Sequence, residues 1–230
     1  MGKRNQSNIN QNKHIMKFTK RDLIDLKHSQ ILTQNEKMRK TSKENNIRLF
    51  NFGITAYKSH STNKITCPFA KDCVKFCYAR KGSFIWTNTK KAYEKRYLLT
   101  KDPDLFKSKM NDAIKRRKAT HIRIHDSGDF YNFQYINVWL RIIRENKNVV
   151  FYAYTKSKVL FNELICLPKN LTLIYSLGSK NDHLIDTSID RHSKIFESEA
   201  ELLKEGYLNA SKNDLIAISK ESNKIGLIIH

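Results

Sequence analysis

Three of the four cysteines in this 230-residue chain lie within eleven residues, and thiols at this spacing can hold a metal centre. They are Cys67, Cys73 and Cys77. The sequence carries no sign of secretion, and pairing two of the three would leave an odd cysteine in a reducing compartment. We therefore predict that the three thiolates bind a metal or a cluster rather than form a disulfide.

The spacing of these cysteines favours an iron-sulfur cluster over a single zinc ion. Zinc usually takes four protein ligands at gaps of two to four residues, whereas the gaps here are five and three. The fourth cysteine, Cys166, is expected to be a small buried hydrophobe. A 4Fe-4S cluster on three cysteines leaves one iron open to a substrate or cofactor. Zinc is the alternative metal, and a site without metal is the third possibility.

Polar residues follow several segments that the pattern predicts to be strands. His125, Asp126, Ser127, Gly128 and Asp129 end an alternating segment that begins at residue 121. The ends of two further apolar runs, 149–154 and 171–175, are followed by polar residues that include Lys156 and Ser176. Additional strands are expected at 49–57, 215–218 and 225–229. In parallel sheets functional residues gather where strands end, so these loops and the cysteine loop predict one shared site.

The predicted helices alternate with these strands. Helices are expected at 88–99, 104–117, 134–145 and 158–164, the third with Trp139 on an apolar face that belongs to the core. Trp86, which follows the cysteine loop, is expected to cover that loop from solvent. Strands alternating with helices predict an α/β fold with a mostly parallel sheet, open or curled into a partial TIM-like barrel.

The chain divides by composition into two parts. Residues 1–46 are polar and basic, and we expect a partly disordered arm or one short helix there. Residues 47–230 form the predicted α/β domain, with the cysteine loop at 60–80. No stretch approaches the roughly 20 apolar residues of a membrane span, and no secretory signal is present. A cytoplasmic protein with no membrane partner is therefore expected, while the oligomeric state is not indicated.

The strongest compositional signal is positive charge. The chain has 43 basic and 22 acidic residues, a formal net charge of +21, which predicts attraction to a polyanion, most simply nucleic acid. An AT-rich genome that enriches lysine is the alternative explanation. The basic run at the end of the helix expected at 104–117 supplies the candidate nucleic-acid-binding residues, which are Lys115, Arg116, Arg117 and Lys118.

Four segments of the chain resemble the phage and plasmid gene product 88 family. The segments are 66–73, 76–80, 122–131 and 151–156, which read TCPFAKDC, FCYAR, IRIHDSGDFY and FYAYTK. The layout of a strand, a three-cysteine loop and a parallel partial barrel is also similar to the radical S-adenosylmethionine superfamily. That superfamily usually spaces its cysteines by three and then two residues, unlike this chain.

The second resemblance implies roles for particular residues. Cys67, Cys73 and Cys77 would ligate three irons of a 4Fe-4S cluster, and the fourth iron would bind the methionine part of S-adenosylmethionine. The implied cofactor-binding residues are Ser127, Gly128 and Asp129 for the amino group, Tyr78 near the adenine, and Ser176 on the same rim. Cleavage of the cofactor would require an external reductant. From the residues themselves, His125, Asp126 and Lys156 are the catalytic or substrate-binding candidates.

Two classes of function follow from these features. The first is a radical-S-adenosylmethionine-like enzyme that acts on nucleic acid or a nucleotide-linked substrate. The alternative is a non-catalytic, metal-clipped nucleic-acid-binding protein of a mobile element, with a role in replication or regulation. A zinc hydrolase that uses His125, Asp126 and Asp129 is a third class, but the chain has no His-Glu-x-x-His motif.

Overall fold

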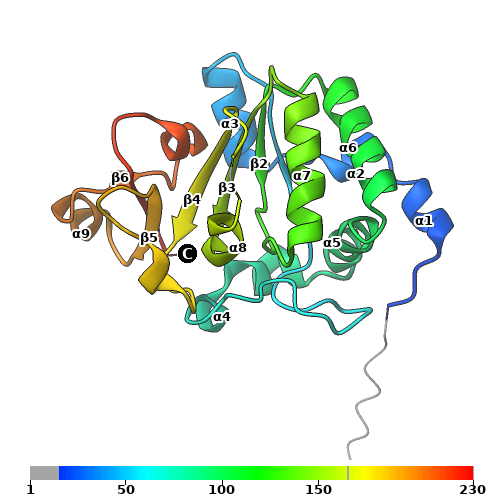
Figure 1. Ribbon diagram of the computed structural model, residues 1–230, viewed down its shortest axis with the longest axis horizontal. Coiled ribbons are helices and arrows are strands. Elements are labelled where there is room, and N and C mark those ends of the chain that lie inside the picture. The colour runs from blue at the N-terminus through cyan, green and yellow to red at the C-terminus, as the bar shows by residue number, and fades with distance from the viewer. Residues whose placement is uncertain (1–15, 165, 230) are drawn as a thin grey trace, which may run out of the picture.

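The computed structural model describes residues 16–164 and 166–229, and its centre is a seven-stranded, all-parallel sheet that curls into a half-barrel (Figure 1). The strand order is β1-β2-β3-β4-β5-β7-β6. This arrangement confirms the predicted α/β class and partial barrel. The strands are β1 (Leu49–Phe52), β2 (His121–Ile124), β3 (Val150–Thr155), β4 (Leu171–Ser176), β5 (His192–Phe196), β6 (Leu208–Asn209) and β7 (Lys224–Ile228).

One face of the sheet is covered by three long helices, α5 (Thr87–Leu99), α6 (Pro103–Arg117) and α7 (Phe133–Glu145). Asp102 caps α6 and Pro103 occupies its first turn, while the side chain of Asn132 caps α7. Both signals are typical of helix starts. The core under these helices includes Phe52 on β1, and its ring contacts that of Trp139 on α7 at a centroid distance of 5.4 Å. The prediction of Trp139 as a core residue is confirmed.

The opposite face packs against a smaller set of elements. Because side chains alternate along a strand, Leu49 and Tyr152 point away from the face that carries Phe52. They pack with Met38 of α3 (Glu36–Glu44) and with Ala217 of η4 (Asp214–Ile218), a 3-10 helix. The sheet is therefore buried on both faces, as parallel sheets are.

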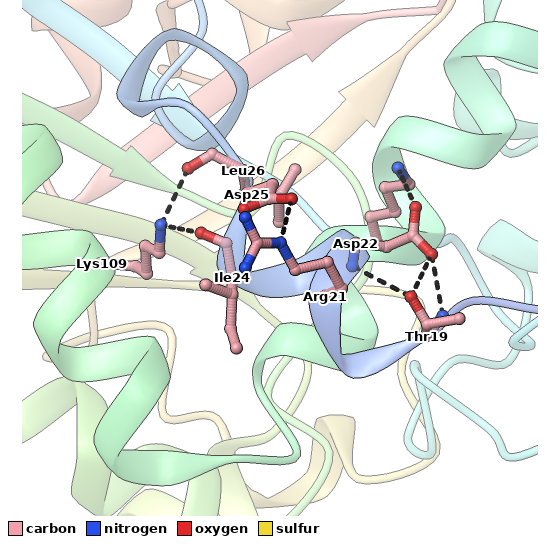
Figure 2. Close-up of polar contacts among 8 residues, drawn as sticks. Thr19, Arg21, Asp22, Ile24, Asp25, Leu26 and Lys109 are labelled. Atoms are coloured by element: carbon pink, nitrogen blue, oxygen red, sulfur yellow. Dashed lines mark hydrogen bonds and ion pairs between the residues drawn. The ribbon is translucent and has the colours of Figure 1, made fainter.

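The described part of the predicted basic arm is helical. Besides α3 it contains α1 (Lys20–Ile24) and α2 (His28–Ile31), where the sequence predicted no more than one short helix. Figure 2 shows Thr19 and Asp22 bonded to each other at the start of α1, and Lys109 of α6 donating to the carbonyls of Ile24 and Leu26. These bonds fasten the segment to α6. Residues 1–15, the remainder of the predicted arm, lie outside the described residues.

The C-terminal third differs from the prediction in four elements. The apolar run at 215–218, expected to be a strand, is η4, because Asn213 caps Leu215 and the neighbouring Asp214 is buried in ion pairs. Strands β5 and β6 and the helix α9 (Glu199–Lys204) were not predicted. Charged residues interrupt the apolar pattern in β5 and α9, and β6 has only two residues. The short elements between these strands are α8 (Lys158–Asn162) and η3 (Asp182–Leu184).

Neither 16–164 nor 166–229 contains a helix with the length and apolarity needed to cross a bilayer.

Candidate functional site

The cysteine loop lies at the edge of the sheet where the strands end. It includes α4 (Cys73–Phe76) and η1 (Tyr78–Arg80), and η2 (Gly82–Ile85) follows it. Figure 1 shows α4 at the bottom of the view, below the sheet. The amide of Asp129, after β2, donates to the Thr66 carbonyl at 3.1 Å. The Thr66 hydroxyl donates in turn to the Thr55 carbonyl at 2.6 Å. Cys67 therefore lies beside the loop that follows β2.

The same loop is bound to the segment that follows β4. The amide of Asp72 donates to the Gly178 carbonyl at 3.3 Å, and the amide of Lys180 donates to the Phe69 carbonyl at 2.9 Å. The ammonium of Lys180 also donates to the carbonyl of Pro68 at 2.9 Å. Loops that are about a hundred residues apart in sequence are thus joined at one rim, as expected for the carboxyl ends of parallel strands.

The three clustered thiols are free and half-buried. Cys67 Sγ accepts a hydrogen bond from the Tyr57 amide at 3.3 Å. Burial, together with the nearby Asp129, Cys77 and Cys73, raises the pKa of the Cys67 thiol to about 12. Burial also raises the pKa of Cys73, although the nearby Lys156 opposes this effect. Because their pKa values are raised, the thiols of Cys67 and Cys73 stay protonated near neutral pH unless a cation joins them.

The donor set is compatible with an iron-sulfur cluster in its chemistry. Three sulfur ligands with a backbone N–H donor to one of them are what such clusters use. Within 16–164 and 166–229, however, no group of three or more His, Cys, Asp or Glu side chains is arranged to hold a metal ion. The assignment of Cys67, Cys73 and Cys77 as ligands stays a prediction.

Cys166 does not behave as expected from the sequence. It is exposed rather than buried. The carbonyl of Cys166 accepts a bond from Arg144 near the end of α7, and the segment leads into the start of β4. Cys166 therefore lies at the amino edge of the sheet, opposite the cysteine loop. The expectation of a buried hydrophobe is wrong because the connection runs over the surface.

Asp129 connects the loops that follow β2 and β3. Its carboxylate accepts from the Thr155 hydroxyl at 2.6 Å, the Lys156 amide at 2.9 Å and the Phe130 amide at 2.7 Å. The residue is buried, and burial raises its pKa while these bonds oppose the rise. A carboxylate can accept about four hydrogen bonds. Three of these acceptor positions are therefore used within the protein.

The two residues before Asp129 fix the backbone of the loop. Ser127 is buried and its carbonyl accepts from the Ile54 amide at 2.9 Å. Gly128 has φ +80°, and a Cβ at this position would lie 2.2 Å from Cγ1 of Ile54. Only glycine allows both the conformation and the close approach to the strand-end residue. The Ser-Gly-Asp turn therefore packs against Ile54, in the segment that connects β1 to the cysteine loop.

His125 and Asp126 point in different directions. His125 has φ +65° and is buried, with Nε2 2.8 Å from the hydroxyl of Tyr135 and its ring 4.6 Å from that of Phe130. Burial lowers the pKa of His125 to about 3. The imidazole is therefore neutral and packs in the core under α7. Nδ1 has no partner among the described residues.

Asp126 faces the cysteine-loop side. One carboxylate oxygen accepts from the side chains of Asn51 and Tyr93, the latter at 2.8 Å. The other oxygen, Oδ1, is buried and has no partner in the described residues. The hydroxyl of Tyr78 donates to the Asp126 carbonyl. Burial raises the pKa of Asp126, opposed chiefly by Arg96. Tyr78 and Asp126, predicted for separate roles, are thus in contact.

Lys156 and Ser176 occupy the same rim. Lys156 donates from Nζ to the Leu177 carbonyl at 3.3 Å and is close enough to Cys73 to affect its pKa. Ser176 accepts at its hydroxyl from Ser193 of β5 at 3.1 Å. Both predicted residues therefore border the cysteine loop or the segment docked on it.

Several charged residues of the site were not predicted. Arg96 of α5 is buried, and its guanidinium donates from Nε to the Gly53 carbonyl at 2.7 Å. Arg123 of β2 pairs with Asp214 at 3.3 Å, and Lys37 pairs with the same carboxylate at 2.9 Å. These residues lie in polar or alternating stretches that resemble exposed surfaces. No local signal distinguishes them, because their partners are distant in sequence.

The basic run that was predicted to bind nucleic acid lies at the other edge. Lys115, Arg116 and Arg117 end α6, and Lys118 caps it just before β2 begins. Arg116 pairs with Asp112 at 2.8 Å, and the guanidinium of Arg117 lies over the Phe50 ring at 4.5 Å. The run is therefore separated from the cysteine loop by the length of the strands.

Trp86 does not cover the cysteine loop as the sequence suggested. Its side chain is 66% exposed. Trp86 is the residue from which α5 begins, and its carbonyl accepts from the Lys90 amide at 2.9 Å. The ring is thus presented to solvent from the rigid end of a helix.

Comparison with known proteins identifies relatives among phage proteins. The family model described as gene product 88 matches residues 29–229. The gene 88 protein of Mycobacterium phage L5 is 34% identical over 102 residues, which cover 40% of this chain and 43% of that protein. The gene 88 protein of Mycobacterium phage D29 is 33% identical over 102 residues, covering 40% and 42%. Each match spans less than half of the relative, and no solved structure matches the chain.

Proposed function

The chain belongs to the gene product 88 family, and from this premise we propose that it is an iron-sulfur protein of radical S-adenosylmethionine type that acts on nucleic acid or a nucleotide-linked substrate. The observation that supports the proposal most is the position of the cysteine loop. It follows β1 of an all-parallel half-barrel and is bonded to the loops after β2 and β4. Ligand sites of parallel sheets lie at this edge.

The proposed cluster ligands are Cys67, Cys73 and Cys77. When bound, the cluster would supply the one-electron chemistry that cleaves S-adenosylmethionine, with the electron coming from an external reductant. The chain itself contributes binding and orientation. The backbone N–H of Tyr57 stabilises negative charge on Cys67, and Lys156 does the same for Cys73.

The cofactor-binding role of the Ser127, Gly128 and Asp129 turn is supported by its contacts. Asp129 has one free acceptor position for an ammonium group after its three hydrogen bonds are counted. Tyr78 is held by the Asp126 carbonyl while much of its ring stays exposed, so the ring is free to contact an adenine. Ser176 and Lys156 lie on the rim where the polar part of a substrate would enter.

The experiment that tests the cluster is metal analysis of anaerobically purified protein. We expect about four iron and four sulfide per chain, and a reduced-state electron paramagnetic resonance spectrum that changes when S-adenosylmethionine is added. Cys73→Ala should abolish iron binding. Cys166→Ala is the matched control, because Cys166 lies at the opposite edge of the sheet, and it should retain all of the iron. Stoichiometric zinc without iron, or full iron in the Cys73→Ala protein, would overturn the proposal.

A second function is favoured by the charge of the molecule. The net charge of +21 also suits a non-catalytic, metal-clipped nucleic-acid-binding protein of a mobile element. The same preparation separates the two functions. A cluster whose spectrum is unchanged by S-adenosylmethionine, together with nucleic-acid binding that weakens as salt increases, would support the second function over the first.

A further inference from the structure

The surface around the cysteine loop combines exposed rings with unbalanced positive charge. We call it the loop face and define it as residues 57–91. Five of the ten exposed large hydrophobic side chains in the described residues belong to it. They are Tyr57, Ile65, Tyr78, Ile85 and Trp86, and Trp86 is the most exposed of the five. Half of the exposed large apolar side chains of the described residues thus come from one continuous segment of the chain, and such a concentration is typical of an interaction site.

The loop face carries eight basic residues and one acidic residue. The basic residues are Lys58, Lys64, Lys71, Lys75, Arg80, Lys81, Lys90 and Lys91, all exposed except the half-buried Lys90, and the acidic residue is Asp72. Asp72 approaches Lys75 at 4.0 Å. None of the other seven forms an ion pair within the described part of the chain. Such a surface attracts a polyanion.

The rings of the loop face are held in place by their neighbours. Tyr78 contacts Phe84 with ring centroids 5.6 Å apart, and Phe84 contacts Tyr93 of α5 at 5.3 Å. The guanidinium of Arg80 lies 5.3 Å from the centre of the Tyr57 ring. Because the ring of Tyr78 is held by its neighbours and the backbone of Trp86 is fixed at the start of α5, little backbone entropy is lost when a flat ligand stacks on this segment.

The other basic surface lacks this combination. At the amino edge, Arg116 forms an ion pair with Asp112, and the guanidinium of Arg117 lies over the Phe50 ring. The exposed large hydrophobic side chains of the described residues include none between 100 and 120. A phosphate chain would find charge there, but a base would find no ring on which to stack.

We propose that the loop face binds single-stranded nucleic acid, with a base stacked on Trp86 and the phosphates on the surrounding lysines and Arg80. In a duplex the flat faces of the bases are covered by their neighbours, so an exposed ring selects a single strand or an unpaired end. The inference rests on the proposed function and deepens it, because it names the substrate class. It also places the strand across the loop that carries the three thiols.

The test is a titration of the full-length protein with single-stranded and duplex oligonucleotides of equal length, with the iron content measured beforehand. The chain has two tryptophans, and Trp139 is buried. Single-stranded DNA or RNA should therefore quench Trp86, while the emission of Trp139 stays as an internal reference. Labelled oligonucleotides give the affinity by anisotropy. Trp86→Ala should abolish the quenching and weaken binding of the single strand by about 5- to 100-fold, with a smaller effect on the duplex.

Two matched charge reversals locate the phosphate contacts. Lys75→Glu with Lys81→Glu changes the loop face, and Lys115→Glu with Lys118→Glu makes the same change in net charge at the amino edge. The first pair should weaken binding of the single strand tenfold or more and reduce the slope of log affinity against log salt by about 1.4, the loss of two contacts to a single strand. The second pair should weaken binding less than threefold.

Several results of these titrations would overturn the inference or the proposed function. Equal loss in the two charge pairs, unchanged affinity after Trp86→Ala, or tighter binding of the duplex would overturn the inference. A change of Trp86 fluorescence with anionic lipid vesicles but not with oligonucleotides would also overturn the inference, because it would indicate that the loop face binds a membrane. Iron-loaded protein that fails to bind would refute the inference and leave the proposed cluster standing. Protein that binds the single strand but never takes up iron would refute the proposed cluster and leave the inference about nucleic-acid binding standing.

Discussion

At the scale of single residues, Asp126 depends on the absence of a side chain at position 53. A Cβ on Gly53 would lie 1.8 Å from Asp126 Oδ1 and 2.8 Å from Cε1 of Tyr93. Asp126 is half-buried between strand β1 and helix α5, and this partial burial raises the pKa of its carboxyl group. Gly53 therefore determines whether the carboxylate can reach Tyr93, which is the contact that orients it on the cysteine-loop side.

The first prediction is that Gly53→Ala is destabilising. The added methyl group must displace Asp126 or Tyr93, and overpacking of this kind costs about 1–3 kcal/mol. Urea unfolding followed by circular dichroism measures the change. Gly206→Ala is the control, because nothing lies within 4 Å of a Cβ there and only its φ of +77° opposes the substitution. Its cost should be about 1 kcal/mol. A Gly53→Ala protein as stable as the wild type would contradict the close approach.

The second prediction concerns pH and His125, whose pKa is lowered to about 3 by burial. Above pH 6.5 the imidazole is neutral in the folded and unfolded chains. Between pH 6.5 and about 3 the unfolded chain binds a proton that the folded chain does not. His125 therefore lowers the free energy of unfolding as the pH falls, by up to about 1.4 kcal/mol per pH unit.

His125→Asn tests this linkage, because asparagine tolerates the positive φ of this position. Between pH 6.5 and 4.5 the variant should lose about 2–3 kcal/mol less stability than the wild type, measured by urea unfolding at each pH. His183→Asn, at an exposed histidine, is the control for removing a histidine from this chain. Parallel pH curves for wild type and His125→Asn would show that the histidine is not held neutral in the core.

At the scale of elements, helix α5 holds the segment that leads into the cysteine loop. Glu94 is buried and accepts from the Thr55 hydroxyl at 2.7 Å, the His60 amide at 2.9 Å and the Ser61 amide at 3.1 Å. It also accepts from the hydroxyl of Ser59. Despite burial, these bonds lower the pKa of Glu94. One carboxylate thus fixes a turn that forms few bonds with the sheet.

The third prediction is that Glu94→Ala loosens this turn. Removing the carboxylate leaves several buried donors without an acceptor, which should cost about 3 kcal/mol. Limited proteolysis should then cut the chain between residues 58 and 64. Ser59→Ala is the matched control, because it removes one donor to Glu94 and an acceptor of Thr62 while the carboxylate stays in place, and it should cost about 1 kcal/mol. Equal stability of the two variants would argue against Glu94 as the organising group.

At the scale of the whole molecule, the net positive charge lowers the stability of the folded state. The described residues contain eleven ion pairs, far fewer than their 40 lysines and arginines, which are the 43 of the chain without Lys3, Arg4 and Lys13. Most of the cations therefore repel one another in the folded state. Self-repulsion of a highly charged protein destabilises the compact state.

The fourth prediction follows from this imbalance. Raising sodium chloride from 20 to 200 mM should increase the urea midpoint of unfolding, because salt screens the repulsion. The same change should weaken binding of nucleic acid. The two opposite salt effects are measured by denaturation and by anisotropy on the same preparation. A midpoint that falls with salt would mean that attractive pairs dominate the electrostatics of the fold.

Several features follow from the sequence alone. The alternation of residues 121–124 and the helical apolar period of residues 133–145 determine a strand and a helix, and the continuous apolar run that begins at residue 149 is typical of a strand buried on both faces. Strands joined by helices run parallel, so the polar residues after each strand meet at one edge. The place of the cysteine loop beside Asp129 is the result of that rule, and the wider fold class was predictable for the same reason.

Other features were decided by the tertiary structure. His125 and Asp126 are adjacent in the sequence, yet one enters the core under α7 and the other faces Tyr93. Trp86 and Trp139 are the same residue type, and only packing exposes the first and buries the second. Glu94 is buried with partners more than thirty residues away. Local patterns report which side of an element is apolar, whereas the partners of a polar side chain depend on contacts between segments distant in the chain.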